Sequence, residues 1–129
     1  MFAHARASLP NECCGVIGGN NKKAKSIYRL RNVAENPLNT YSAAPEDLFI
    51  AQKQMRERGE QLLAIYHSHP RVTNPTPSET DIALAYYPTA LYLIIGFETH
   101  TQVLKAFRIY ESERRWEEVG YKVLEDNDS

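Results

Sequence analysis

Apolar residues recur along this chain in two kinds of pattern: short compact or alternating runs, and stretches with the spacing of a helix face. Residues two apart share a face of a strand, whereas residues three and four apart share a face of a helix. In chain order the patterns predict the last turns of a helix, two strands joined by a turn, a helix, a strand, a short helix and three strands, at residues 2–8, 13–18, 26–33, 45–59, 62–66, 78–88, 91–97, 101–109 and 116–124. The chain is therefore expected to combine helices with a sheet.

The two helices in the middle of the chain have recognisable starts. Pro45 can occupy a first helical turn, because its fixed φ is already helical and its missing N–H is not needed there. Ser78 is a good N-cap, and the carboxylate of Asp81 suits the positive end of a helix dipole. The residues expected on the apolar face of this second helix are Ile82, Ala85 and Tyr86.

Residues 62–66 form a compact apolar run, which is typical of a strand buried on both faces. The run leads directly into His67-Ser68-His69-Pro70, and a loop holding Pro75 and Pro77 follows. Polar chemistry therefore begins where a buried central strand ends.

Composition narrows the class of protein. The 129 residues are 43% hydrophobic and 24% charged, as expected for one folded domain spanning residues 1–129 and not for a disordered chain. Fifteen basic and sixteen acidic residues give a net charge of -1, which supplies no field for gathering nucleic acid or an anionic membrane. The longest apolar stretch, residues 90–97, is far shorter than the roughly 20 residues of a membrane-spanning helix. We expect neither nucleic acid nor a membrane among the partners.

The cysteines indicate the compartment. Cys13 and Cys14 are adjacent, so a bond between them would strain disulfide geometry and close almost no loop. Both lie in an apolar run, where a free cysteine behaves as a small hydrophobe more often than as a nucleophile. These features favour a reducing, cytoplasmic setting.

His67 and His69 have the spacing of two ligands of one metal ion, because residues two apart in an extended segment point to the same side. Catalytic zinc sites use three ligands from histidines and carboxylates plus one water, and Asp81 is the leading candidate for the third. The plainer interpretation is that the histidines are ordinary loop residues and that Ser78 and Asp81 only cap a helix. The residues alone leave both interpretations open.

The combination of these motifs resembles the JAMM, or MPN-plus, family of zinc metalloproteases. The family pattern is an early Glu, then His-Ser/Thr-His-Pro, then Ser-x-x-Asp, and the matching residues here are Glu12, His67 to Pro70 and Ser78 to Asp81. Segments 10–15 and 41–47 also resemble those of small bacterial members. The loop between His69 and Ser78 is one residue longer than is usual in the family.

The resemblance implies a fold and a role for each residue. The implied fold is an α/β (α+β), cytidine-deaminase-like three-layer domain, in which helices flank a curved mixed sheet. His67, His69 and Asp81 would hold Zn²⁺, Glu12 would act as the general base, and Ser78 would stabilise the oxyanion. Without the resemblance, Glu12 would be interpreted as a solvated carboxylate at the end of a strand.

The resemblance also implies an activity, the hydrolysis of an amide bond by a metallopeptidase or isopeptidase. Its substrate would be the C-terminal tail of a ubiquitin-like or sulfur-carrier protein, joined to an extension, to a lysine or to a cysteine. Two alternatives remain, a non-catalytic interaction scaffold of the same fold and a metal hydrolase of a small amide.

The other polar features are not assigned to the site. His4 and His100 have no partner at a ligand-like spacing and are expected to be surface or structural residues. The lysines of residues 22–25 are interpreted as a solvated hairpin turn.

Overall fold

The computed structural model describes residues 1–98 and 101–122. Its elements are α1 (Phe2–Ser8), β1 (Cys14–Asn20), β2 (Lys23–Leu30), α2 (Pro45–Glu57), β3 (Gln61–His69), α3 (Glu79–Ala83), β4 (Leu91–Phe97), β5 (Gln102–Tyr110), the 3-10 turn η1 (Glu111–Glu113) and β6 (Arg115–Val119). The strands form one sheet in the order β2-β1-β3-β4-β5-β6. The sheet is mixed, because β3 and β4 are parallel and the other neighbouring pairs are antiparallel.

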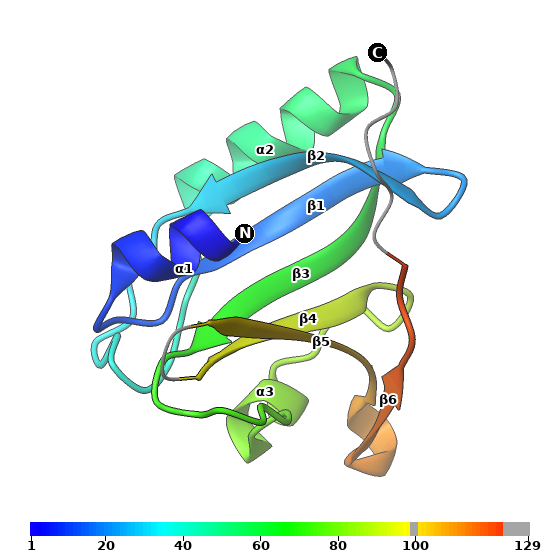
Figure 1. Cartoon of the computed structure of the whole chain (residues 1–129). Helices are drawn as coiled ribbons and strands as arrows, with labels where there is room; N and C mark the ends of the chain where they lie inside the picture. Colours follow the sequence, from blue (N-terminus) through cyan, green and yellow to red (C-terminus); the bar gives the residue numbers. More distant parts are fainter. Residues whose placement is uncertain (99–100, 123–129) are drawn as a thin grey trace.

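Helices cover both faces of this curved sheet (Figure 1). Ala5 of α1 packs on one face, in a cluster that includes Ile17 and Tyr66. On the opposite face, Ala51 of α2 packs with Val16, and the segment after α3 adds a third apolar cluster. Alternate residues of each strand thus supply the two cores, as the period of two requires. The three-layer α+β arrangement expected from the resemblance is confirmed.

β3 lies near the middle of the sheet and continues further than its apolar run. It is paired with β1 from Gln61 to His67 and with β4 from Ala64 to His69. The polar His-Ser-His segment is therefore part of the strand. The sequence underestimates this strand because its last residues are polar and yet continue the ladder to β4.

The helix expected over residues 78–88 is wrong in length, since α3 ends at Ala83. Pro88 disfavours a helical conformation in the residue before it, and the intervening backbone turns back toward β4. The Tyr87 N–H donates to the Tyr92 hydroxyl at 3.1 Å. Ala85 is buried as expected, but Tyr86 is 70% exposed and does not belong to the apolar face.

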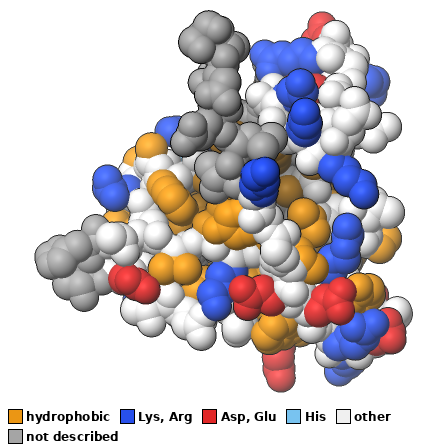
Figure 2. Space-filling model, turned by 45° about the vertical axis from the view of Figure 1, so that its right-hand side comes forward, with side chains coloured by type: hydrophobic (Ala, Val, Ile, Leu, Met, Phe, Trp, Pro, Cys, Tyr) orange, Lys and Arg blue, Asp and Glu red, His pale blue; other side chains and the backbone are white. Residues whose placement is uncertain are grey.

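The final strand is also shorter than the pattern of residues 116–124 indicates, since β6 ends at Val119. Residues 123 and 124 of the expected strand, and His100, lie outside the described residues. Figure 2 shows a face of the molecule on which hydrophobic side chains lie in a group, with charged side chains of both signs around them. Within residues 1–98 and 101–122, no helix is long and apolar enough to cross a membrane.

Candidate metal centre

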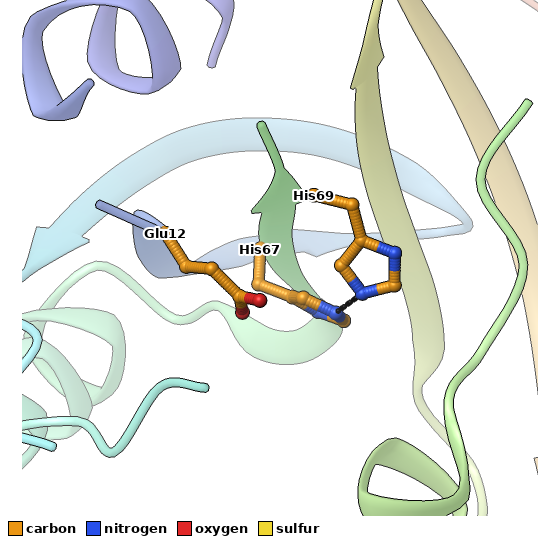
Figure 3. Close-up of side chains that lie close together, drawn as sticks. All are labelled: Glu12, His67 and His69. Carbon is orange, nitrogen blue, oxygen red and sulfur yellow. Dashed lines mark hydrogen bonds between the residues drawn. The ribbon is translucent and has the colours of Figure 1, made fainter. Parts of the chain in front are cut away.

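The candidate site lies at the carboxyl end of β3. Because His67 and His69 are two apart on this strand, both rings project to the side of the sheet that carries α2 and α3. Cys14 of β1 is paired with His67, and Glu12 lies two residues before Cys14, so Glu12 approaches from the segment that leads into the neighbouring strand. In Figure 3 the Glu12 carboxylate points toward the two imidazoles.

Three potential ligand atoms lie at nearly equal distances from one another. The Nε2 atoms of His67 and His69 lie 3.0 Å apart, and Oδ2 of Asp81 lies 3.1 Å from each of them. The side chain of His67 is fully buried, and those of His69 and Asp81 are 13% and 8% exposed. One small cation at the centre of such a triangle can be bound by all three lone pairs, so the donor set suits a divalent metal ion.

A capping box places Asp81 in this triangle. The Asp81 N–H donates to Oγ of Ser78 at 3.1 Å, and the Ser78 N–H donates to Oδ2 of Asp81 at 2.9 Å. The same carboxylate oxygen faces both histidines, so the capping and the ligand interpretations of Asp81 are compatible. The longer loop after His69 does not prevent this approach.

Ser78 keeps a usable proton while it caps α3. A hydroxyl has two lone pairs and one O–H, and the cap uses only a lone pair of Ser78. The O–H of Ser78 can therefore still donate elsewhere while the residue caps α3. Ser78 also lines a small surface pocket beside the cluster, together with Tyr41, Thr80 and Leu84.

Asp81 and His69 influence each other's protonation. Burial acts to raise the pKa of Asp81, but its hydrogen bonds to His67 and His69 and the attraction of His67 outweigh burial, so that pKa lies far below its usual range. Burial acts to lower the pKa of His69, but the hydrogen bond and charge of Asp81, aided by Glu12, raise it overall. The cluster therefore favours positive charge next to the Asp81 carboxylate.

Glu12 is a second carboxylate at the site. Its side chain is buried, with 6% of its surface exposed, and a carboxylate oxygen lies within 4.8 Å of a ring nitrogen of each histidine. Burial raises the pKa of Glu12 to about 7, with a smaller opposing effect of His69 and a smaller reinforcing effect of Asp81. The interpretation of Glu12 as a solvated carboxylate is therefore wrong, and a pKa near 7 suits a group that gives and takes protons at neutral pH.

Tyr41 is a component of the site that the sequence did not single out. Its ring stacks on that of His67, with centroids 4.6 Å apart and an angle of 25° between the planes. Nδ1 of His67 is buried and has no hydrogen-bond partner in the described part of the chain. Packing against Tyr41 therefore helps to set the orientation of this imidazole. The sequence placed Tyr41 in a segment that resembles small bacterial members but gave it no role at the site, because the contact depends on how the loop before α2 folds back.

The remaining polar candidates lie outside the cluster. Nδ1 of His4 lies 2.7 Å from the Tyr66 hydroxyl, so His4 links α1 to the sheet as a structural residue. Cys13 and Cys14 are free and buried, as expected of small hydrophobes. Residues 22–25 are exposed at the hairpin between β1 and β2, which confirms their interpretation as a solvated turn.

Fold and site together define an α+β domain with a candidate metal centre at the end of its central strand. A family model described as prokaryotic homologs of the JAB domain matches residues 1–110. The chain belongs to this family. This confirms the resemblance to JAMM proteins that the Glu, His-Ser-His-Pro and Ser-x-x-Asp motifs indicated.

Curated relatives support the same assignment. The chain is 32% identical over 100 residues to desampylase of Haloferax volcanii, covering 73% of this chain and 71% of that protein. It is 32% identical over 114 residues to CysO-cysteine peptidase of Mycobacterium tuberculosis, covering 86% and 77%. It is 36% identical over 112 residues to a probable TtuB-protein conjugate cleaving protease of Thermus thermophilus, covering 86% and 70%. These names confirm the expectation of a hydrolase of the peptidase class.

Solved structures agree on the fold. A protein from Desulfitobacterium hafniense is similar with a TM-score of 0.85 at 34% identity, covering 99% of this chain and 88% of that chain. A protein from Salinibacter ruber, at 22% identity, has a TM-score of 0.65 over 98% of this chain and 86% of that chain, and supports the fold alone.

Proposed function

We propose that this protein is a zinc-dependent metallopeptidase in which His67, His69 and Asp81 hold the metal. The observation that carries the proposal is the triangle of their Nε2 and Oδ2 atoms, with sides of 3.0, 3.1 and 3.1 Å. Ligands about 2.0 to 2.1 Å from a tetrahedral zinc are roughly 3.3 Å from each other, so only a small expansion of the triangle is needed. When bound, zinc supplies Lewis-acid chemistry, which polarises a carbonyl and eases the deprotonation of water.

Glu12 performs the proton transfer in this proposal. Its carboxylate reaches the histidines from the segment before β1, and burial holds its pKa at about 7. As a carboxylate it accepts the proton of the attacking water, and as a carboxylic acid it then donates that proton to the leaving nitrogen. Glu12 is thus a base and an acid in turn, and not a fourth ligand.

Ser78 stabilises the developing negative charge in this proposal. Its O–H is not consumed by the cap of α3, and its side chain lines the pocket next to Asp81. A donor directed at the carbonyl oxygen as that oxygen gains charge lowers the barrier without being changed in the reaction.

We propose as substrate the C-terminal tail of a ubiquitin-like or sulfur-carrier protein, released by cleavage of one amide bond. The proposal is supported by the relatives named for CysO-cysteine and for TtuB-protein conjugates. The bond joins the tail to an extension, to a lysine or to a cysteine. A carrier-protein substrate of each kind is therefore assayed. An extended tail could be recognised through its main chain, as is common for peptide ligands of sheets.

We further propose that residues 1–129 act as one domain in the cytoplasm. All the described strands belong to one sheet, which supports a single domain. The buried, free thiols of Cys13 and Cys14 suit a reducing compartment.

The testing experiment is zinc analysis of the purified wild type beside His69→Ala and Glu12→Gln, with cleavage of carrier-protein fusions assayed on the same samples. We expect about one zinc per chain in the wild type, loss of zinc in His69→Ala, and retention of zinc by an inactive Glu12→Gln. A folded wild type that binds no zinc and cleaves no fusion would instead make the protein an interaction scaffold.

A further inference from the structure

The side chain of Asn32 makes all four hydrogen bonds that an amide can form. Its Nδ2 donates to the backbone carbonyls of Glu12 and Thr40, at 3.0 Å each. Its Oδ1 accepts from the backbone N–H groups of Ala34 and Ser42, also at 3.0 Å each. Four satisfied bonds of a partly buried amide fix both the side chain and its partners.

These bonds connect the segment before β1 to the loop between β2 and α2. The loop also accepts a hydrogen bond from the Glu12 N–H, at the carbonyl of Pro37, over 2.8 Å. The loop therefore holds Glu12 at both its backbone N–H and its backbone C=O. Because Glu12 lies just outside β1, two residues before Cys14, these bonds to the loop determine where its side chain starts.

The same amide holds the backbone on both sides of Tyr41. Thr40 and Ser42 are the two neighbours of Tyr41, and each is bound by one end of the Asn32 amide. Tyr41 stacks on His67, whose Nδ1 has no hydrogen-bond partner among the described residues to orient the ring. One side chain thus connects the backbone of Glu12 to the residue that packs on a histidine of the cluster.

We propose that Asn32 is a positioning residue, which sets the place of the Glu12 carboxylate relative to His67 and His69. The role rests on the proposed function, because Glu12 must be held at the distance of one water from the metal ligands. Asparagine is suited to it, because the partners are two carbonyls and two N–H groups. Aspartate of the same shape has no donor and would place a negative charge against the carbonyls of Glu12 and Thr40.

The test compares Asn32→Asp with a matched control, Asn36→Asp, in the full-length zinc-loaded protein. Asn36 is exposed in the same loop and accepts hydrogen bonds through its backbone carbonyl. The control therefore makes the same change from amide to carboxylate and adds the same negative charge. We expect Asn32→Asp to retain zinc and to lose at least about tenfold in kcat, with KM changed by less than about threefold, and Asn36→Asp to resemble the wild type. If Asn32→Asp does not fold, the neutral Asn32→Ser variant is judged by the same criteria.

Crystal structures of the variants give a readout that does not need activity. We expect the Glu12 carboxylate to be displaced from the two histidines in Asn32→Asp and to stay in place in Asn36→Asp. An Asn32→Asp protein with wild-type kcat and an unmoved Glu12 would overturn the proposal while the proposed function stands. A wild type without zinc or activity would refute the proposed function instead, and the position of Glu12 in the variant structures would still decide whether Asn32 positions it.

Discussion

At the scale of single residues, the site holds a carboxylate in a place that does not favour its charge. Glu12 is buried, and burial raises its pKa from 4.5 to about 7, so near neutral pH a large part of it keeps its proton. Such a group exchanges protons readily with a water molecule. The cost of ionising it appears in the stability of the protein, as is common for functional residues.

The pH dependence of stability in the metal-free protein measures this cost. Because the pKa of Glu12 is higher in the folded chain, the folded state binds the proton more tightly, and stability falls as pH rises from 4.5 to about 7. We expect Glu12→Gln to match the wild type at pH 4 and to exceed its free energy of unfolding by about 2 kcal/mol at pH 8. Urea unfolding at both pH values checks this, with exposed Glu57→Gln as control. A difference that is the same at both pH values would contradict the raised pKa.

At this scale, the sequence predicts a residue's place in the site correctly where that place depends on the type of residue and its spacing from other residues. His67, His69 and Asp81 could be found because two positions on a strand and one at a helix start are local features. Tyr41 and Asn32 could not, because their roles depend on a loop whose path follows from tertiary contacts with the segment before β1 and with β3. Single aromatic and amide side chains have no pattern that reveals such contacts in advance.

At the scale of elements, α3 is a short helix whose start is part of the site. It has five residues, and among them only Ile82 packs against an apolar cluster, so apolar packing contributes little to holding it in place. The capping box of Ser78 and Asp81 therefore matters more here than in a long helix. The sequence predicted this start correctly and the end incorrectly, since the cap is encoded by two nearby residues whereas the end depends on the turn back to β4.

Two substitutions of Ser78 separate its cap from its proposed role in the reaction. Ser78→Ala removes both the cap and the hydroxyl donor, so we expect a loss of about 1 kcal/mol in stability and about 100-fold or more in kcat. Ser78→Thr keeps a capping hydroxyl, and we expect it to retain the stability and most of the activity. Thermal unfolding and steady-state kinetics on zinc-loaded samples check both. If Ser78→Ala lost stability but kept its kcat, Ser78 would be a cap and nothing more.

At the scale of the whole molecule, the candidate metal ligands come from two parts of the fold that differ in local stability. His67 and His69 belong to a strand paired on both sides, whereas Asp81 belongs to the short, exposed α3. A metal held by both parts would transfer some of the stability of the sheet to the segment from residue 70 to residue 90. Removing it should therefore act locally before it acts globally.

Metal removal followed by hydrogen exchange tests this division. In the wild type we expect chelation to raise the exchange of backbone amides in α3 and its flanking loops at least about tenfold, while β1, β3 and β4 stay protected by the paired sheet. We expect His69→Ala to show fast exchange in α3 with or without chelator, because its cluster has already lost one ligand. Equal exchange in α3 with and without metal in the wild type would mean that the capping box alone fixes Asp81, and that the metal is bound to a site already in place. A loss of protection across β3 itself would mean that the metal supports the sheet as a whole and not α3 in particular.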